Sequence, residues 1–389
     1  MKDICQKLAT KIERNLNSLV FLYGGSNLNF QLSFKDQANI IDKERNEMNI
    51  LVYTSIYPAP EKIGIPADTK VVHYFAKEWT NCGHNVRVIY LHLNPIKKIS
   101  ESIKKFKLIS TSHYEYEGIM VDLIECQLIK PHGRHPSRFQ ANIINKLVKS
   151  IKNGMDFNAD KVFVHFPTAF TGITELVNSD APTIATFHNA DIITLKSEKK
   201  CLSYVSSFDV WGSRSRKISD YLCGISEKKI FQIYSGIDEK LLIGENGVYE
   251  KINKPNSVLT IVYAGNLIPL KNVDILIEAI KSIDSHNHIQ LRIIGDGPEE
   301  DKLKRLSGDD DRIKFYGRLS REETINQMRE ADLFAMVSSP ETFGLVYIEA
   351  MGQGCITLGS SGEGIDGVIV DGVNGYLIRP GDVKALRGV

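Results

Sequence analysis

The sequence of 389 residues lacks the features that mark several large classes of protein. It has no apolar run near the about 18 residues that a membrane-spanning helix requires, and the run SLVFLYGG near the start is far shorter. The first residues, MKDICQKLATKIERN, have no apolar segment followed by a cleavage site of small residues, so we expect no secretion signal. The 42% of hydrophobic residues instead predict a globular protein long enough for two domains.

Cysteine and histidine are also too scattered to indicate a metal centre. The six cysteines contain no C-x-x-C pair, which favours reduced thiols in a cytosol and argues against zinc. They are Cys5, Cys82, Cys126, Cys201, Cys223 and Cys355. His132 and His135 lie close together in KPHGRHP, but no carboxylate or thiolate is adjacent in the sequence. We therefore expect no bound metal and no metal cofactor.

The glycine-rich loops of the common nucleotide-binding motifs are missing as well. No G-x-G-x-x-G follows a predicted strand, and G-x-x-x-x-G-K-[ST] does not occur. Dinucleotide chemistry and P-loop chemistry therefore lose support.

Positive and negative residues nearly balance in the chain as a whole, but the two halves of the chain have net charges of opposite sign. Residues 48–235 contain 24 Lys and Arg against 17 Asp and Glu, whereas residues 236–389 contain 17 against 24. Two halves of opposite sign indicate two domains with different partners.

A lysine cluster stands out in the basic half, in LNPIKKISESIKKFKLIS at residues 93–110. Its members are Lys97, Lys98, Lys104, Lys105 and Lys107. Mixed with apolar side chains, they suit a peripheral contact with an anionic membrane. The alternative is a solvated helix face beside an ordinary strand. No recognised nucleic-acid motif accompanies the charge, so we expect no nucleic-acid partner.

Strands and helices alternate along most of the chain. The segments MNILVYTS, HNVRVIYLHL, DKVFVHF, PTIATFH and FDVWGS are β-rich, and TKVVHYFAKEWTNCG follows the first of them with helical periodicity. A second series follows a polar stretch near 240–257: strands SVLTIVYAG, IQLRIIGDGP, RIKFYGRL, DLFAMVSS and CITLGSS, and helices NVDILIEAIKSI and SREETINQMREA. The latter helix opens with a capping box, Ser320 and Glu323.

This alternation predicts an α/β protein of two Rossmann-like, doubly wound domains that face each other across a cleft. We expect an N-terminal domain at 48–240 and a C-terminal domain at 241–389. Residues 1–47 have mixed polarity without a clear period, and we assign this extension no function. Ligands of such sheets bind at the carboxyl ends of the strands.

Two candidate features follow strands of the second series. Lys271, in NLIPLKN, stands just before a helix, where its charge would add to free amides and the helix dipole in holding a phosphate. The alternative is an ordinary surface lysine at a helix start. GDGP at 295–298 ends a strand in a tight turn, and plain turn chemistry explains it equally well.

Two glutamates flank the apolar helix of SSPETFGLVYIEAMGQG. Gly344 would let a ligand approach the amides at the start of this helix, which suit a diphosphate. With a rise of ~1.5 Å per residue, Glu341 and Glu349 would lie about 10 Å apart along the axis, roughly the span from a hexose to a ribose across a diphosphate. A carboxylate accepts hydrogen bonds from sugar hydroxyls. The alternative is a helix with one exposed glutamate.

These motifs together resemble a known family. The pattern E-x7-E in ETFGLVYIE, followed by AMGQGCITLGSSGEGIDGVIVDGVNGYLIRPGD, resembles the retaining glycosyltransferases of family 4, which have the GT-B fold. The resemblance covers roughly residues 48–382 and includes GNLIPLKNVDILIEAI, IIGDGP, FYGRL, ATFHNAD and YSGID in the family's order.

The resemblance implies roles for residues of the C-terminal domain. Glu349 would hold the ribose of a nucleotide-diphosphate sugar, Glu341 would lie beside the donor sugar, and Lys271 would offset charge on the diphosphate leaving group. The amides of Phe343, Gly344 and Leu345 would meet sugar hydroxyls and phosphates. The other donor-binding candidates are Gly265, Asn266 and Thr342.

In the N-terminal domain the resemblance implies two further residues. His188 would face the donor sugar, although a capping or core histidine is the alternative. Gly64 would let its loop approach the phosphates. Such enzymes need no metal, and the nucleotide-diphosphate sugar serves as co-substrate rather than a cofactor.

Two departures from the family pattern bear on activity. The family usually has arginine where Asn266 stands, so one of two cations for the leaving group is absent unless Arg318 or Lys62 replaces it. The chain also stops at GDVKALRGV, where the family normally continues, so we expect a C-terminal domain that is truncated at its end.

The expected activity is retaining transfer of a sugar to a glycan or lipid-linked acceptor in surface polysaccharide synthesis, such as lipopolysaccharide or capsule. The expected location is the cytoplasm, at the inner face of the plasma membrane. Two alternatives stay open: a nucleotide-sugar binding subunit without transfer activity, and an enzyme of the same fold that epimerises the sugar nucleotide.

Overall fold

The computed structural model describes residues 47–65, 70–95, 109–129, 133–237, 241–253, 258–284 and 288–388. They form two compact units. The N-terminal unit ends at residue 233, a few residues before the position expected from the sequence, and residues 215–217 group with the C-terminal unit. Residues 1–46, the lysine cluster at 97–107 and His132 lie outside the described residues.

The N-terminal unit is built on an eight-stranded sheet with the order β3-β4-β2-β1-β5-β6-β7-β8. The strands are β1 (Asn49–Thr54), β2 (Asn85–Pro95), β3 (Ile109–Tyr116), β4 (Ile119–Leu128), β5 (Lys161–His165), β6 (Thr183–Phe187), β7 (Val210–Ser213) and β8 (Ile230–Gln232). Neighbouring strands are parallel except β3 and β4, which are antiparallel. The five strands predicted for this unit are confirmed.

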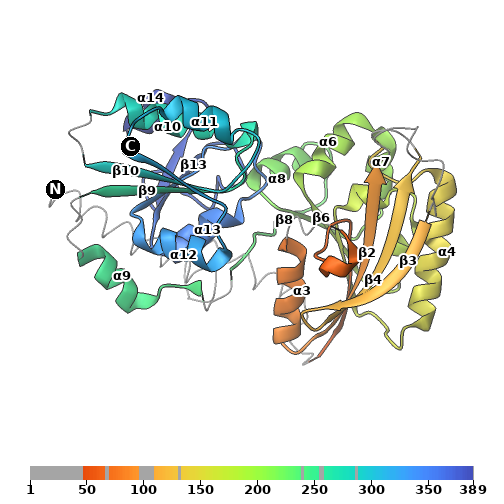
Figure 1. Ribbon diagram of the computed structural model, residues 1–389. Coiled ribbons are helices and arrows are strands. Elements are labelled where there is room, and N and C mark those ends of the chain that lie inside the picture. Colours follow the sequence, from red (N-terminus) through yellow and green to blue (C-terminus); the bar gives the residue numbers. More distant parts are fainter. Residues whose placement is uncertain are drawn as a thin grey trace. The chain divides into compact units, whose positions relative to one another are not determined.

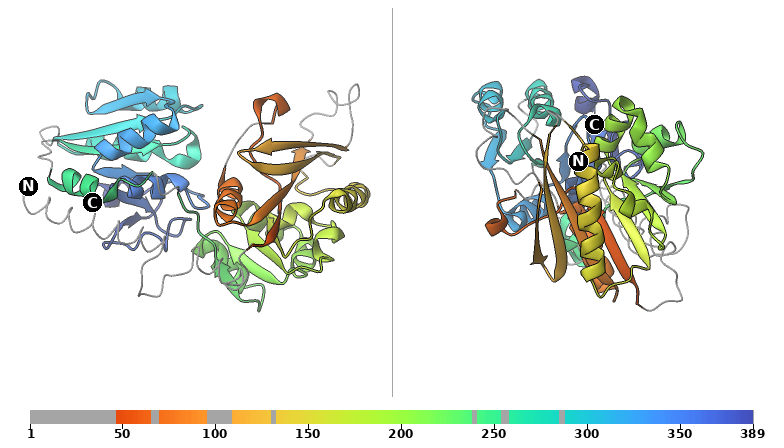
Figure 2. Two further views of the ribbon diagram at one scale, coloured as in Figure 1. Left: turned by 90° about the horizontal axis from the view of Figure 1, so that it is seen from below. Right: turned by 90° about the vertical axis from the view of Figure 1, so that its right-hand side faces the viewer.

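Helices cover both faces of this sheet. They are α3 (Val71–Asn81), α4 (Arg138–Gly154), α5 (Thr174–Val177), α6 (Asn189–Ser197), α7 (Lys199–Val205) and α8 (Arg216–Cys223), with 3-10 turns η1 (Glu61–Ile63) and η3 (Pro167–Phe170). Alternate residues of β1 enter opposite cores, since Ile50 packs with α3 and Leu51 packs with α4. Figure 1 shows α3 and α4 on opposite sides of β2 and β4, and the right view of Figure 2 shows α4 running alongside the strands.

The hairpin of β3 and β4 was not predicted from the sequence. Its two-residue turn, Glu117–Gly118, has positive φ at both positions, 47° and 84°. Such a turn favours Asn-Gly or Asp-Gly, and Glu-Gly does not give that signal. Glu117 is held instead by ion pairs with Lys70 and Lys77, at 3.1 and 2.6 Å.

The C-terminal unit contains a six-stranded sheet that is parallel throughout, with the order β11-β10-β9-β12-β13-β14. Its strands are β9 (Leu259–Ala264), β10 (Ile289–Ile294), β11 (Ile313–Gly317), β12 (Leu333–Ala335), β13 (Ile356–Ser360) and β14 (Gly375–Ile378). The five strands predicted for this unit are confirmed; β14 was not predicted.

The helices of this unit are α9 (Gly244–Asn253), α10 (Val273–Ser282), α11 (Glu300–Ser307), α12 (Arg321–Glu330), α13 (Leu345–Gly352) and α14 (Val383–Gly388), with a 3-10 turn η5 (Pro269–Lys271). Figure 1 shows α10, α11 and α14 on one face of the sheet and α12 and α13 on the other. The predicted capping box is confirmed: the Ser320 hydroxyl accepts from the Glu323 amide, and the Glu323 carboxylate accepts from the Ser320 amide.

Both units are therefore doubly wound α/β layers, as the sequence predicts. No helix among the described residues is both long enough and apolar enough to cross a bilayer.

Candidate functional site

The order of strands in the C-terminal sheet indicates a binding site at the carboxyl ends of the adjacent strands β9 and β12. The chain passes from β9 to β10 and β11 on one side, then returns to β12 on the other side of β9. Loops after β9 and β12 thus diverge in opposite directions, and such a switch point is where open parallel sheets bind ligands. These two loops carry Lys271 and Glu341 respectively.

Lys271 and Glu341 contact each other at this switch point. The Lys271 ammonium lies 2.6 Å from Oε2 of Glu341, and the two side chains are 22% and 13% exposed. An ion pair that keeps this partial access to solvent can exchange its partners for a ligand. Lys271 is therefore part of a charged cluster.

Glu341 is held from several sides. Its Oε1 accepts from the Thr342 amide at 3.0 Å, and its Oε2 also accepts from the Ser338 hydroxyl at 3.3 Å. Its own amide donates to Oε2 of Glu363 at 3.0 Å. These bonds fix both the carboxylate and the loop that carries it.

Glu363 is a member of this cluster that the sequence analysis missed. It is only 5% exposed, and its Oε1 accepts from the Ser339 hydroxyl and from the Lys217 ammonium, both at 2.8 Å. The only signal in the sequence was an acidic residue within the glycine-rich stretch GSSGEGIDG. Lys217, distant in sequence, gave none.

The helix after this loop begins as predicted. Gly344 is the N-cap of α13 with φ of 75°, and a Cβ there would lie 2.6 Å from the Tyr347 ring. The Phe343 side chain is buried and stacks on Tyr234, with ring centroids 5.7 Å apart. Any contact of Phe343 with a ligand would therefore use its main chain. Leu345 begins the first turn of α13, and the amides of a first turn have no carbonyl acceptor within the helix.

Glu349 lies on α13 and is neither unpaired nor fully solvated. Its Oε1 accepts from the Arg321 guanidinium of α12 at 2.7 Å, and the glutamate side chain is 16% exposed. The predicted separation of about 10 Å between Glu341 and Glu349 assumed that both residues lie on one helix, and this assumption is wrong. The helix begins only at Leu345, so Glu341 lies in the preceding loop and a helical rise does not apply to it.

The loop of Gly265 and Asn266 packs against the GDGP turn. A Cβ on Gly295 would lie 1.9 Å from the Gly265 carbonyl oxygen, so this close approach requires glycine. Leu267 donates its amide to the Asp296 carbonyl at 2.8 Å. GDGP therefore shapes the loop after β9 rather than acting as a plain turn.

Asn266 itself is exposed. Arg318 lies at the same turn, because its guanidinium is 3.6 Å from the Asp296 carboxylate and 78% exposed. It is thus placed on the loop that packs beside Asn266. Lys62 belongs to the N-terminal unit, where it is exposed in η1.

In the N-terminal unit, His188 follows β6 and is the N-cap of α6. Its ring stacks on Phe166, with centroids 3.7 Å apart, and its Nε2 lies 3.3 Å from Nδ1 of His165. Burial, the neighbouring His165 and Arg214 hold the pKa of His188 well below its usual range, so the ring is neutral. His188 is therefore a capping histidine, as the alternative states. This position does not exclude the predicted contact with the donor sugar.

The His188 amide donates to Oδ2 of Asp191 at 2.8 Å, while Oδ1 of Asp191 accepts from the amide and hydroxyl of Thr168. Burial raises the pKa of Asp191 to about 6 despite these bonds. Gly64 ends η1 in the left-handed region with φ of 73° and is exposed.

Comparison with known proteins shows which family the chain resembles. The family model described as glycosyl transferases group 1 matches residues 248–388. An uncharacterised glycosyltransferase of Methanocaldococcus jannaschii is 26% identical over 76% of this chain and 82% of its own length. Residues 248–388 are thus similar to group 1 glycosyltransferases, and the similarity to the relative extends over most of the chain.

Other relatives match smaller parts of the chain. N-acetyl-alpha-D-glucosaminyl L-malate synthase of Bacillus anthracis is 26% identical over 59% of this chain and 64% of its own length. A lipopolysaccharide core biosynthesis glycosyltransferase of Rhizobium meliloti is 29% identical over 34% of this chain and 39% of its own. The chain thus spans less than two thirds of the length of both.

Solved structures show the same fold. Anabaena HepE in complex with UDP and glucose has a TM-score of 0.56 at 19% identity, over 87% of this chain and 88% of that one. Sucrose-phosphate synthase from Thermosynechococcus elongatus has a TM-score of 0.59 at 15% identity, over 87% and 88%. The predicted GT-B fold class is confirmed.

The family match contains most of the charged cluster of the C-terminal unit, but not Lys217. Lys271, Glu341 and Glu349 lie inside residues 248–388, whereas His188 and Gly64 lie outside them. The roles implied for the individual residues stay predictions.

Proposed function

We propose that this protein is a glycosyltransferase that moves a sugar from a nucleotide-diphosphate sugar to a glycan or lipid-linked acceptor, with retention at the anomeric carbon and without a metal ion. The observation that carries the proposal is the Lys271–Glu341 pair at the switch point, 2.6 Å apart and beside the N-terminus of α13. A cation, a carboxylate and helix amides together suit a ligand with both phosphates and sugar hydroxyls. The complex of HepE with UDP and glucose supports such a donor.

Lys271 supplies the charge in the transfer step. When the diphosphate binds, its ammonium turns from Glu341 to the phosphate oxygens and offsets the negative charge that grows there as the bond to the sugar breaks. Glu341 then accepts hydrogen bonds from donor hydroxyls. The donor phosphate helps to deprotonate the acceptor hydroxyl on the same face of the sugar, and attack from that face gives retention.

Glu349 recognises the nucleotide. As an acceptor-only group it takes hydrogen bonds from the two ribose hydroxyls, and its ion pair with Arg321 orients it. This answers why an apolar helix carries a carboxylate at that position.

Calorimetric binding of UDP, GDP and ADP, and of their common sugars, tests the proposal. We expect one nucleotide to bind, and Glu349→Ala to weaken it at least tenfold. Glu330→Ala is the matched control, because Glu330 also pairs with an arginine, Arg292, at 2.9 Å. Absence of binding to any nucleotide by the folded protein would contradict the proposal.

Anomeric analysis of the product by NMR tests retention, and a chelator should not reduce the rate.

We further propose that the acceptor belongs to surface polysaccharide synthesis, such as lipopolysaccharide or capsule, and that the enzyme works in the cytoplasm at the inner face of the plasma membrane. The support is the lysine cluster at residues 97–107, the absence of a C-x-x-C pair from the sequence, and the relative named for lipopolysaccharide core biosynthesis. Flotation with anionic vesicles should recover the protein, and neutral vesicles should not. Equal recovery with both would remove the electrostatic contact.

A second candidate is a binding subunit that holds the nucleotide sugar without transferring it. Asn266 favours it, because the resembled family usually has a second cation there. This candidate predicts donor binding with neither transfer nor donor hydrolysis, and Asn266→Arg should then create activity. If wild-type activity instead depends on Arg318, that residue supplies the second charge.

A further inference from the structure

Three residues with metal-binding side chains meet in the N-terminal unit, outside the residues proposed for transfer. His135 lies just before α4, Glu198 joins α6 to α7, and Cys201 lies in the first turn of α7. Their ligand atoms all lie within 4.8 Å of one another. The sequence analysis saw no carboxylate or thiolate beside His135, because both come from more than 60 residues further along the chain.

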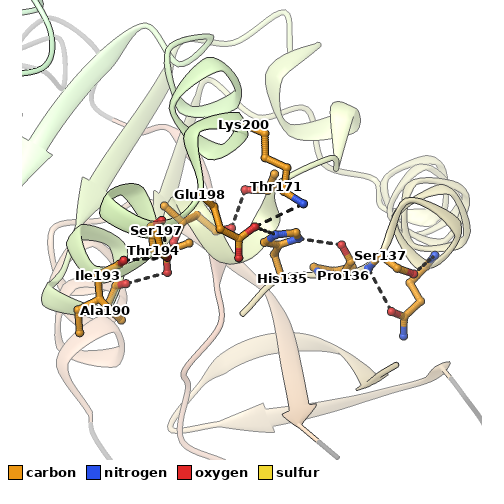
Figure 3. A network of polar contacts seen from close by, with 12 residues as sticks. His135, Pro136, Ser137, Thr171, Ala190, Ile193, Thr194, Ser197, Glu198 and Lys200 are labelled. Carbon is orange, nitrogen blue, oxygen red and sulfur yellow. Dashed lines mark hydrogen bonds and ion pairs between the residues drawn. The ribbon is translucent and has the colours of Figure 1, made fainter. Parts of the chain in front are cut away.

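The hydrogen bonds of His135 make this group unusual. Its Nδ1 lies 2.9 Å from the Pro136 carbonyl oxygen, an acceptor that requires the Nδ1 proton. In the neutral ring Nε2 then carries a lone pair, yet it faces Oε2 of Glu198 at 2.7 Å. Figure 3 shows the ring between these two oxygens. At that distance the ring nitrogen and the carboxylate oxygen need a proton or a metal cation shared between them.

The three donor types match one class of cation. Imidazole nitrogen, carboxylate oxygen and thiolate sulfur are the ligands of zinc and of cobalt in its place, and a carbonyl that fixes the other ring nitrogen is the usual second partner of a ligating histidine. Cys201 is fully buried and the His135 side chain is 8% exposed, while the Glu198 side chain is 31% exposed. The group is thus enclosed on two sides and open on one, where a water would complete a tetrahedron.

We propose that His135, Glu198 and Cys201 bind one divalent metal ion of the zinc class. On binding, the Cys201 thiol loses its proton to solvent, any proton on Nε2 of His135 does the same, and both atoms bond to the metal. A tetrahedral ion holds its nitrogen and oxygen ligands about 3.4 Å apart, so Glu198 must move back by less than about 1 Å. Its partial exposure allows this movement.

The Lys200 ammonium would compete with a metal ion for the Glu198 carboxylate. Its ammonium lies 3.4 Å from Oε2 of Glu198, and its side chain is 57% exposed, so it can leave toward solvent. The metal would then join the start of α4 to the α6–α7 junction, segments separated by 63 positions. Its role is therefore to hold the N-terminal unit together, and it takes no part in the proposed transfer chemistry.

Titration of the full chain with cobalt(II) tests the proposal. We expect one equivalent to bind with a near-ultraviolet thiolate-to-cobalt charge-transfer band. Cys201→Ser should abolish the band, and His135→Gln or Glu198→Gln should weaken binding at least tenfold. The matched controls are Cys82→Ser and Cys223→Ser, which remove exposed thiols and should leave the band unchanged. A wild-type protein without the band, or a Cys201→Ser variant that keeps it, overturns the proposal.

Loss of binding in a variant could also result from misfolding, so a variant that is expected to bind cobalt more tightly provides an independent test. Lys200→Gln removes the competing ammonium and should tighten cobalt binding severalfold; an unchanged or weaker affinity counts against the site. Zinc should raise the thermal midpoint of the wild type and not that of His135→Gln. If zinc shifts neither, His135 and Glu198 form only a hydrogen-bonded pair and the metal site is overturned. Calorimetric binding of the nucleotide to His135→Gln tests the proposed function without the metal site, so failure of this site and failure of the proposed function are distinguishable.

Discussion

The two units share one architecture but place different chemistry at the ends of their strands. In the C-terminal unit, the loops after β9 and β12 carry charged side chains that pair with one another, as Lys271 does with Glu341. In the N-terminal unit, the corresponding ends of β5 and β6 carry the aromatic rings of His165, Phe166 and His188; His188 stacks on Phe166 and is tilted against His165. At these strand ends an ion pair thus lies in one unit and a cluster of rings lies in the other.

The pKa values of the two histidines sharpen this contrast. Burial, together with Arg214, lowers the pKa of His165 to about 3, and burial also lowers that of His188. Both rings are neutral at physiological pH. A charged site suits the diphosphate of a donor, whereas neutral rings suit the apolar faces and hydroxyls of a sugar, so the difference fits a division of labour between the units.

The largest effect is expected where the C-terminal unit concentrates charge. Lys271→Ala removes the cation that we propose offsets the charge of the leaving group, and should lower kcat by about 10²–10³, while nucleotide affinity falls much less. Lys281→Ala is the control, since Lys281 is an exposed lysine of the neighbouring α10 that bonds the Leu306 carbonyl. Steady-state transfer and calorimetry measure the two quantities.

A double variant tests whether Lys271 and Glu341 act as a pair. If they do, the loss in Lys271→Ala plus Glu341→Ala is smaller than the sum of the single losses. Additive losses would mean that the ion pair has no role in the reaction.

The next effect concerns acid stability of the N-terminal unit. His165, whose folded pKa of about 3 lies below the unfolded value of about 6.5, contributes stability above pH 6.5 that is lost as pH falls toward 3. His188, whose folded pKa is also lowered by burial, acts in the same direction. Between those values the unfolded state binds more protons, and each group removes at most about 1.4 kcal/mol per pH unit. Asp191, raised to about 6, has the opposite sign: its contribution is present at low pH and is lost as pH rises through 6.

Two histidines outweigh one aspartate in this balance, so acid should unfold the N-terminal unit first. Both tryptophans, Trp79 and Trp211, are buried in that unit, and their fluorescence reports on it alone. His165→Gln should flatten the fluorescence-monitored loss of stability between pH 6 and 4. A C-terminal unit that unfolds at the same pH, judged by nucleotide binding, would break the contrast.

The contrast also explains what could be predicted from the sequence. In the C-terminal unit Lys271 and Glu341 each lie in the segment that follows a β-rich run, so these two residues and the start of α13 could be placed by local pattern. What failed there depended on partners distant in sequence: Arg321 beside Glu349, and Lys217 beside Glu363.

In the N-terminal unit the informative contacts are mostly distant in sequence. His135 meets Glu198 across 63 positions, and His165 meets His188 across 23. Periodicity predicts that both histidines of this second pair follow strands, but it gives no information about which rings stack. A sequence pattern specifies a residue's element and face, whereas pairing across elements requires the folded chain.

A smaller effect compares one glycine in each unit. Gly344→Ala places a Cβ 2.6 Å from the Tyr347 ring at positive φ, and should cost about 1–3 kcal/mol and weaken nucleotide binding. Gly64 has a similar φ of 73° but open space around it, so Gly64→Ala should cost about 1 kcal/mol. Denaturant unfolding measures both. Equal costs would show that the ring contact at Gly344 relaxes freely.

The smallest effect uses a capping box in each unit, Ser137 with Gln140 on α4 and Ser320 with Glu323 on α12. Either serine replaced by alanine leaves an N-terminal amide without its side-chain acceptor, at a cost of about 1 kcal/mol. If the units unfold independently, Ser137→Ala lowers the denaturant midpoint seen by tryptophan fluorescence, and Ser320→Ala leaves it in place while lowering the midpoint of nucleotide binding. Equal fluorescence shifts for both variants would mean that the two units unfold as one cooperative body, because a cap lost in one would then destabilise the other. The comparison of the units would in that case hold for their chemistry and not for their stability.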